Sequence, residues 1–555
     1  MKKTLLTFVI LTLLTQPIYS QTNITKKQWQ ADLEYLKNLI DQQYPHLYYR
    51  ISQEDFHKSV DEVRKEIPRM DRHEIIVSFA RLIAQFKIGH TAMPLFLAMH
   101  GETLNTDFHT LPVYFYQYSD GLYIQATTED YNEVAGAKVL KIGNMATEKA
   151  IEAIRPVVSA ENDSYFKAYG IPYLSCPEVL HAQGVIADMG TVQLLLEKDG
   201  KTFTKNLPGY EKHHTPAWYG TVTNGHGWVS GMKVEATPLR LKAMDQPFHF
   251  EHLEAEKTVY IRQSQIQNGE NESIAHFYNR VLGMVEHAPV EKLILDLRQN
   301  GGGNNYLNKP IITGLVKSKI NEKGKLIVLI GRRTFSAAQN LVNELEYYTN
   351  AIFIGEPTAE NVNFWGDANK EMLPNCKLPF QLSFMWWQDK DPRDKRLATT
   401  PHIAMELSWD DFYNGKDPVL EMALAYENRV PETIAEIKQQ VLKDKPDLAE
   451  KVGRKFINNQ QNSHQKGELR VAINALGYEY INTNQKLAIE VFKLNTRLFP
   501  DNANGWDSLA EAYLNASDYA KAVEYYKRAI EIDPNGATGT HAREMLEQMR
   551  QHGGG

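Results

Sequence analysis

The residues of this chain best suited to chemistry are a serine and a run of glycines. Ser336 stands where a helix is expected to begin, shortly after an apolar segment at residues 326–330. Another apolar segment, residues 293–297, leads into a turn that contains glycines 301–303. A serine hydroxyl becomes a nucleophile when a base takes its proton, and the N–H groups of glycines can hold an oxyanion. The combination predicts acyl-transfer chemistry, whereas Ser336 alone could be a helix N-cap and the glycines alone a flexible loop.

Two neighbouring strands are expected to bring these residues together. Residues 293–297 and 326–330 are short and continuously apolar, which is typical of strands buried on both faces. Their carboxyl ends would meet at one edge of the sheet, where α/β proteins build their sites. Strand and helix patterns alternate from about residue 233 to 428, which predicts an α/β layer. The further elements expected there are strands at 259–261 and 352–354 and a helix at 274–285.

The amino-terminal part offers a histidine that could serve as the base. Residues from about 25 to 86 are expected to be helical, because apolar side chains recur on one face. That face begins with Trp29, Leu33, Leu36 and Ile40. The last helix is expected to stop at Gly89 and to deliver His90 onto a loop. The chain has 18 histidines, and His90 is distinguished only by its place in Gly89-His90-Thr91.

A β-rich segment and a helical repeat flank the α/β stretch. Residues from about 111 to 207 are mostly extended in pattern, with one helix at 146–154, and their later half resembles a PDZ-like peptide-binding module. After Pro431 the pattern is helical only. Ala488 and Ala522 are 34 residues apart and carry similar neighbours, which is the tetratricopeptide signature in two copies. Such arrays usually present a concave surface to a peptide or another subunit, and a short one needs neighbours for stability.

Composition and charge exclude several classes of protein. With 555 residues and a net charge of −7, the chain is expected to be a multidomain globular protein without a nucleic-acid-binding surface. Cys176 and Cys376 cannot form a disulfide framework or a metal cluster, although one disulfide remains open. His213 and His214 have no partner at metal-ligand spacing, so neither a metal site nor a cofactor is expected.

The amino terminus has the pattern of a secretory signal peptide. Lys2 and Lys3 precede an apolar run at residues 5–14, and Ser20 is a small residue before a plausible cleavage point. The run is too short for a comfortable membrane span, and no cysteine follows the cut to take a lipid. The mature protein is therefore expected to be soluble and exported, to the periplasm or the medium, without a membrane span.

Together with these patterns, six short motifs give the chain a family resemblance. They are Gly89-His90-Thr91, 296–303, 334–338, 355–358, 363–367 and 415–420. In this order they resemble the tail-specific or C-terminal-processing serine peptidases, the S41 family, in its tricorn-like branch. The resemblance implies a multidomain α/β fold. Its expected parts are a signal peptide (1–20), an N-terminal helical domain (21–105), a β-rich PDZ-like domain (106–207), a crotonase-like (ClpP/crotonase) α/β peptidase core (208–428), a helical linker (429–470) and all-α tetratricopeptide repeats (471–550).

The same resemblance implies roles for individual residues. Ser336 would be the nucleophile and His90 its base, since residues 360–363 hold no lysine, the base of another branch. A histidine base needs an acid to fix its tautomer, and Asp394 is the best-placed candidate. The alternative acids are Asp391 and Asp367. The oxyanion donors would be the N–H groups of Ala337 and of Gly301 or Gly302, and Asp296 is expected to stabilise the glycine turn.

Two functions from different classes follow from these observations. The first is an exported serine-type peptidase that acts on peptides or unfolded proteins through Ser336 and His90. The second is a catalytically inactive protein of peptidase fold that binds peptides or partners through its PDZ-like and tetratricopeptide parts, which also serve self-association in some proteins. The presence of both Ser336 and His90 favours the first.

Overall fold

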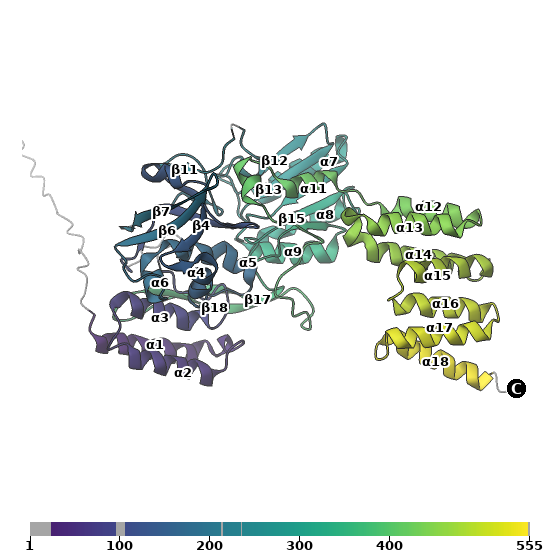
Figure 1. Cartoon of the computed structure of the whole chain (residues 1–555), viewed down its shortest axis with the longest axis horizontal. Helices are drawn as coiled ribbons and strands as arrows, with labels where there is room; N and C mark the ends of the chain where they lie inside the picture. The colour runs from purple at the N-terminus through teal and green to yellow at the C-terminus, as the bar shows by residue number, and fades with distance from the viewer. Residues whose placement is uncertain (1–23, 96–105, 212–214, 235, 553–555) are drawn as a thin grey trace, which may run out of the picture. The chain divides into compact units, whose positions relative to one another are not determined.

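The computed structural model describes residues 24–95, 106–211, 215–234 and 236–552 (Figure 1). These belong to two compact units, Met1–Leu424 and Ala425–Gly555. The expected signal peptide, residues 1–20, and the pair His213 and His214 lie outside the described residues. Within the described part, no helix combines the length and the apolar character that a membrane span requires.

A six-stranded sheet forms the centre of the first unit, in the order β12-β13-β14-β15-β16-β19. β12 runs antiparallel to β13, and the other neighbours are parallel. The strands are β12 (Phe248–Leu253), β13 (Thr258–Gln263), β14 (Lys292–Asp296), β15 (Leu326–Ile330), β16 (Ile352–Gly355) and β19 (Ile403–Ala404). The prediction that the two apolar segments are adjacent parallel strands is confirmed, with Leu295 opposite Val328.

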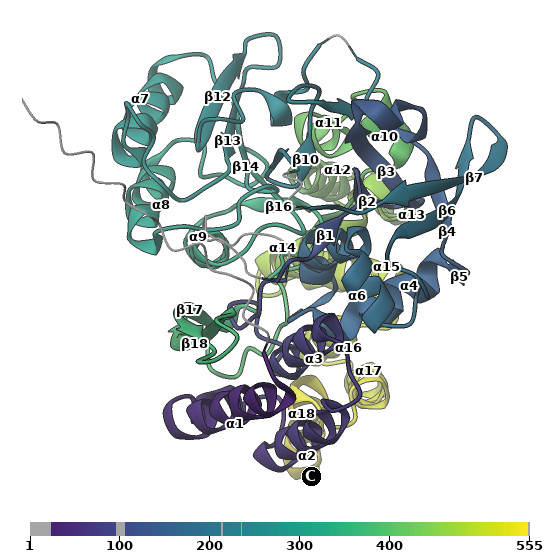
Figure 2. The same ribbon diagram turned by 90° about the vertical axis from the view of Figure 1, so that its left-hand side faces the viewer.

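Helices α7 (Ile274–His287), α8 (Asn308–Lys317) and α9 (Ala337–Tyr348) pack against this sheet. Figure 2 shows α7 and α8 beside one another along the sheet. Their apolar faces share one core with alternate residues of the strands, such as Leu293 and Val328. Apolar residues on both faces of a strand need partners on both sides, which explains why these segments lack polar alternation.

A second, seven-stranded sheet holds the β-rich segment. β11, β3, β4, β6 and β7 follow in that order, β2 pairs with β3, and β5 with β4. The strands are β2 (Val113–Tyr118), β3 (Gly121–Thr128), β4 (Lys138–Ile142), β5 (Met145–Ala146), β6 (Thr191–Lys198), β7 (Lys201–Pro208) and β11 (Trp228–Ser230). The connecting helices are α4 (Thr147–Ile154), α5 (Asp163–Tyr165) and α6 (Pro177–Ala182). Two small pairs are β1 (His109–Thr110) with β8 (Tyr210–Glu211) and β9 (Ala217–Trp218) with β10 (Thr221–Val222).

Three helices and a long hairpin complete the first unit, with α10 (Trp409–Tyr413) and α11 (Pro418–Ala425) at its end. The helices are α1 (Lys26–Gln43), α2 (Gln53–Glu66) and α3 (Arg72–Ala84), and the hairpin strands are β17 (Asn363–Met372) and β18 (Pro379–Gln388). The Asp32 carboxylate of α1 accepts the N–H groups of Asn375 and Cys376 at the hairpin tip, at 2.9 and 2.8 Å. Figure 2 shows the hairpin close to α1. Cys176 and Cys376 are both buried free thiols.

The end of α3 differs from the expectation. The helix ends at Ala84, and the residue that then turns the chain with a positive φ of 51° is Lys87, not Gly89. Gly89 is required for another reason. A Cβ atom there would lie 2.5 Å from a ring carbon of Tyr165 and 2.9 Å from Phe335. The glycine permits close packing of the His90 loop instead of stopping the helix.

The second unit contains helices only among its described residues. They are α12 (Val430–Leu442), α13 (Pro446–Asn458), α14 (Lys466–Tyr480), α15 (Gln485–Leu498), α16 (Ala503–Asn515), α17 (Tyr519–Ile532) and α18 (Ala537–His552). Ala488 and Ala522 are fully buried between paired helices, as the repeat pattern predicts. A Cβ atom on Gly477 would lie 2.5 Å from the Phe492 ring, so this glycine allows α14 and α15 to approach closely.

Candidate active site

Ser336 occupies a sharp turn between β15 and α9. Its backbone has φ 55° and ψ −127°, a conformation that a residue with a side chain adopts only when its surroundings enforce it. The Thr334 hydroxyl donates to the carbonyl of Leu297 at 2.8 Å, and the Ser336 N–H donates to the Glu360 carboxylate at 2.8 Å. These bonds join the turn to the segments that follow β14 and β16. Backbone strain of this kind is often found at catalytic residues.

His90 meets Ser336 at this turn. Its Nε2 atom lies 3.0 Å from the Ser336 Oγ atom, within hydrogen-bond reach. The imidazole stacks on the Phe335 ring, with centroids 4.5 Å apart, and lies nearly parallel to Phe364. Burial lowers the pKa of His90, so the ring is neutral at neutral pH and can accept a proton.

The loop that carries His90 is anchored from the segment before α5. The Gly89 N–H donates to the Glu161 carboxylate at 2.9 Å, and the Tyr165 hydroxyl donates to the Gly89 carbonyl at 3.0 Å. Hydrogen bonds therefore hold both the N–H and the carbonyl group of Gly89, the residue before His90. This fixes the direction in which the imidazole leaves the backbone.

Two buried glutamates lie behind the imidazole, and the sequence reasoning missed both as site residues. The Glu360 Oε1 atom lies 3.6 Å from His90 Nδ1, and Glu360 is fully buried. Glu161 is hydrogen-bonded to Glu360 and also accepts the Asn361 N–H at 3.3 Å. Burial raises the pKa of Glu360 to about 8 and that of Glu161 well above its usual range. Both shifts favour the protonated carboxyl groups, so the Glu161–Glu360 pair keeps protons that an exposed pair of glutamates would lose near neutral pH.

The three aspartates considered from the sequence have other partners than His90. Asp394 is paired with Arg396 at 2.8 Å, and Asp391 with Arg393 at 2.7 Å. Asp367 accepts the indole N–H of Trp387 at 3.0 Å and lines the same cavity as Ser336. Among the described residues, no hydrogen bond or ion pair joins any of these aspartates to His90. The structure brings Ser336 and His90 together. Asp394 instead lies in a charged surface loop, where Arg396 neutralises it, just as Arg393 neutralises Asp391.

The three backbone groups predicted to hold an oxyanion differ in their surroundings. Ala337 is the first residue of α9, where a backbone N–H has no acceptor within the helix. Gly301 is exposed beside Ser336 in the same cavity. The Gly302 N–H instead donates to the Asn300 side chain at 2.9 Å, so it is already occupied. Gly302 has a steric role, since a Cβ atom there would lie 2.6 Å from Ser336 Cβ, and its φ is +102°.

A buried ion-pair network holds the glycine turn, as expected for Asp296. The Arg298 guanidinium bonds to Asp296 at 2.6 Å and to Asp417 at 2.8 Å. Burial acts to raise the pKa of Asp417, but the positive charge of Arg298 outweighs it and lowers the pKa to about 2. The motifs at 296–303 and 415–420 thus meet at one arginine, which ties the end of β14 to the start of α11.

A cavity of about 510 Å³ opens beside Ser336 and His90. Its wall is largely apolar and aromatic, which suits it to a peptide side chain more than to a charged small molecule. The apolar residues at its margin include Met93, Leu95, Val157 and Val158, and the aromatic ones Tyr165, Tyr169 and Tyr173.

Several solved structures are similar to this chain at low sequence identity. Mature CPAF is 12% identical, with 72% of this chain and 96% of that chain covered and a TM-score of 0.50. A putative S41 protease from Bacteroides fragilis is 13% identical, covering 63% of this chain and 95% of that chain, with a TM-score of 0.28. The tricorn protease is 14% identical, covering 72% of this chain and 36% of that chain, with a TM-score of 0.35.

The sequence comparisons address the C-terminal end. The tetratricopeptide repeat model matches residues 503–535, which are α16 and α17. No curated protein matches the chain. The chain is similar in fold to mature CPAF and carries a tetratricopeptide repeat at its C-terminal end, as the repeat pattern predicted.

Proposed function

We propose that this protein is an exported serine-type peptidase that hydrolyses peptide bonds with Ser336 as nucleophile and His90 as base. The observation that carries the proposal is the 3.0 Å contact between His90 Nε2 and Ser336 Oγ. A serine hydroxyl is a weak nucleophile unless a positioned base accepts its proton. Here the base is neutral, half-buried and already within hydrogen-bond reach.

The acylation step uses these groups in order. Ser336 Oγ attacks the carbonyl carbon of the scissile bond while its proton passes to His90 Nε2. The carbonyl oxygen gains a negative charge, which the N–H groups of Ala337 and Gly301 stabilise. His90 then gives its proton to the leaving amine, so that the C–N bond breaks and an acyl-enzyme remains. Water, activated by the same imidazole, hydrolyses the ester and restores Ser336.

In this mechanism the acid that supports His90 is Glu360 instead of Asp394. An imidazolium forms in the transition state and needs a negative charge near Nδ1. Glu360 is the member of the Glu161–Glu360 pair nearer to His90 Nδ1, at 3.6 Å, and its ionised form supplies such a charge. Catalytic contacts are often long before substrate binds and shorten in the complex. Glu360 also bonds the Ser336 N–H, so one carboxylate aligns both partners.

The finer domain assignments belong to the same proposal. Residues 208–428 are the crotonase-like catalytic core, supported by the parallel strands that end at Ser336 and Glu360. Residues 106–207 are a PDZ-like module, supported by the seven-stranded sheet that contains most of their strands. The signal peptide at residues 1–20 directs export to the periplasm or medium.

The substrate is a peptide or an unfolded protein segment. The cavity beside Ser336 accepts an apolar side chain. In the second unit, a cavity of about 520 Å³ is lined by Lys493, Arg497, Trp506, Tyr525 and Arg528. Basic and aromatic side chains of this kind suit a peptide partner or a second copy, as expected for a tetratricopeptide surface.

Peptide turnover tests the proposal against the alternative of an inactive binding protein. The chain lacking residues 1–20 is incubated with a mixed peptide library, and products are identified by mass spectrometry. We expect cleavage by the wild type and none by Ser336→Ala. Ser273→Ala is the matched control. The Ser273 hydroxyl caps helix α7 by accepting the backbone N–H of His276, and this contact does not involve the imidazole ring. Equal cleavage by wild type and Ser336→Ala would overturn the proposal, and peptide binding without any cleavage would favour the binding protein.

A further inference from the structure

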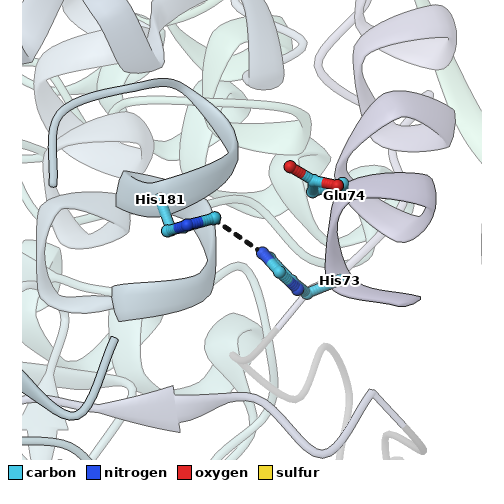
Figure 3. A group of neighbouring side chains, drawn as sticks. All are labelled: His73, Glu74 and His181. Atoms are coloured by element: carbon cyan, nitrogen blue, oxygen red, sulfur yellow. Dashed lines mark hydrogen bonds between the residues drawn. The ribbon is translucent and has the colours of Figure 1, made fainter. Parts of the chain in front are cut away.

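Two histidines outside the catalytic cleft turn their rings toward each other. His73 lies at the start of α3, and His181 lies near the end of α6, which packs against α3. The Nε2 atom of His73 is 2.9 Å from the Nδ1 atom of His181, as Figure 3 shows. The two residues are 108 positions apart, which is why their spacing carried no signal in the sequence.

A carboxylate completes the cluster. Glu74 follows His73 on α3, and in Figure 3 its carboxylate extends from the helix toward the side on which His181 lies. One ligand atom from each of His73, Glu74 and His181 lies within 4.8 Å of the other two. The Glu74 Oε2 atom accepts the Asp71 N–H at 2.7 Å in a capping box, which leaves Oε1 to act as a ligand.

The electrostatic surroundings suit a cation. An imidazole binds a metal through the lone pair of a nitrogen that carries no proton. Three carboxylates, Glu74, Asp71 and Glu178, interact electrostatically with His73 and place negative potential at the pair. A hydrogen bond between two neutral rings accounts for the 2.9 Å contact only. Asp71 and Glu74 also form the capping box of α3, and Glu178 pairs with His109, whereas a divalent cation would in addition use the remaining Oε1 atom of Glu74.

The other histidine–carboxylate cluster of the described chain has a different explanation. His90, Glu161 and Glu360 also lie within 4.8 Å of one another. Their carboxylates are used by backbone N–H groups of the loops around Ser336, including those of Gly89 and Ser336 itself. That cluster belongs to the proposed peptidase site.

We propose that His73, Glu74 and His181 form a binding site for a divalent transition-metal ion of the Zn²⁺ class. Two imidazole nitrogens and one carboxylate oxygen are ligands that Zn²⁺ takes, with a water in the fourth position. Metal–nitrogen bonds of about 2.0–2.1 Å in a tetrahedral site place two nitrogens about 3.3 Å apart, so the two rings would separate by a few tenths of an ångström to admit one ion. The ion ties α3, which leads to the His90 loop, to α6. Its role is to stabilise the first unit, and it takes no part in peptide cleavage.

Metal titration of the chelator-treated full chain tests the site. Zn²⁺ and Co²⁺ are added separately, and stoichiometry, the visible absorption of Co²⁺ and the melting temperature are measured. We expect one ion per chain, ligand-field bands of Co²⁺ bound to nitrogen and oxygen, and a rise in melting temperature with metal. Loss of a supporting partner alone costs metal sites about 10–100-fold in affinity, so His181→Asn is expected to cost at least that.

The variant Glu74→Gln weakens the proposed metal ligand while it preserves the cap of helix α3. A glutamine at this position still accepts the Asp71 N–H, because a capping box uses Glu or Gln, but it is a much weaker metal ligand. We expect an unchanged melting temperature without metal and a loss of affinity of at least about tenfold. His276→Asn is the matched control, since His276 is an exposed histidine beside a single carboxylate, Glu272.

Two outcomes would overturn the proposal. Equal binding by wild type, His181→Asn and Glu74→Gln would show an adventitious ion only. Binding that survives His181→Asn but is lost in Glu161→Gln would place the ion in the cluster around His90. Because the readouts are metal affinity and melting temperature, a failure of peptidase activity leaves this test intact.

Discussion

The Nε2 atom of His90 lies 3.0 Å from the Oγ atom of Ser336, although 246 residues separate them in the chain. His90 comes from the loop after α3, and Ser336 from the turn after β15. Phe335 stacks on the imidazole and precedes the serine, so the two loops are packed together at the contact itself. The Glu161–Glu360 pair connects the same two loops from behind.

Replacing the carboxylate nearest to His90 should impair catalysis. Glu360→Gln removes the ionisable carboxyl group that faces Nδ1 while keeping the size of the side chain. We expect kcat to fall by about 10²–10⁴-fold, the range found when a base loses its positioned acid. Steady-state kinetics on a cleaved peptide measure the effect. Glu356→Gln is the control, since Glu356 lies on the same loop but is paired with Arg332. An equal loss of kcat in both variants would assign the effect to loop stability.

The pH profile should follow the lowered pKa of His90. The base acts in its neutral form, and burial shifts its pKa below the usual 6.5. We therefore expect kcat/KM to fall at acidic pH with an apparent pKa below 6.5. A rate profile from pH 4.5 to 9 measures the limb. An acidic limb above pH 6.5 would mean that the negative pair raises the pKa of His90 more than burial lowers it.

The Glu161–Glu360 pair should make stability depend on pH. The pKa of Glu360 rises from about 4.5 to about 8 on folding, so the folded protein keeps a proton that the unfolded chain has lost. The contribution is fully present below pH 4.5 and is lost as pH rises through about 8. We expect the free energy of unfolding of the first unit to decrease over this window. Denaturant unfolding measures it, and Glu161→Gln, which removes one titrating group, should flatten the dependence. A variant with the wild-type slope would refute the shared proton.

The two glycines beside Ser336 should respond differently to alanine. In Gly302→Ala the new Cβ atom meets Ser336 Cβ at 2.6 Å and the backbone keeps a φ of +102°. The serine must move, and a displacement of about 1 Å costs about 10²-fold in rate. In Gly301→Ala the nearest atom is the Tyr169 hydroxyl at 3.4 Å, and the N–H remains. We expect near-normal kcat there. Equal losses in the two variants would contradict the separate roles.

The sequence predicted what depends on local pattern. The apolar segments at β14 and β15, the serine before α9 and the repeat spacing each lie within a short stretch, so periodicity and turn residues suffice to find them. The motif that contains His90 was also local, although its proximity to Ser336 is a tertiary contact. The reason for Gly89 was not local, because the crowding comes from Tyr165 and Phe335.

The sequence could not predict what depends on burial. Glu360 begins the segment 360–363, where another branch of the family has a lysine. Nothing in that segment indicates that the Glu360 carboxylate is fully buried. Glu161 lies about 200 residues away and is recognised only through its bond to Glu360. Asp394 was the acid best placed by the family resemblance, and a charged neighbour, Arg396, is what pairs with it. Gly302 looked like an oxyanion donor until its N–H was seen to bond Asn300.

Covalent labelling of Ser336 tests the central claim most directly. A fluorophosphonate probe is incubated with the chain lacking residues 1–20, and the modified residue is identified by peptide mass spectrometry. We predict that the label is on Ser336, that His90→Ala slows labelling by at least about 10²-fold because the base is gone, and that Ser273→Ala labels at the wild-type rate. Labelling of another serine, or a rate in His90→Ala equal to that of the wild type, would contradict the account.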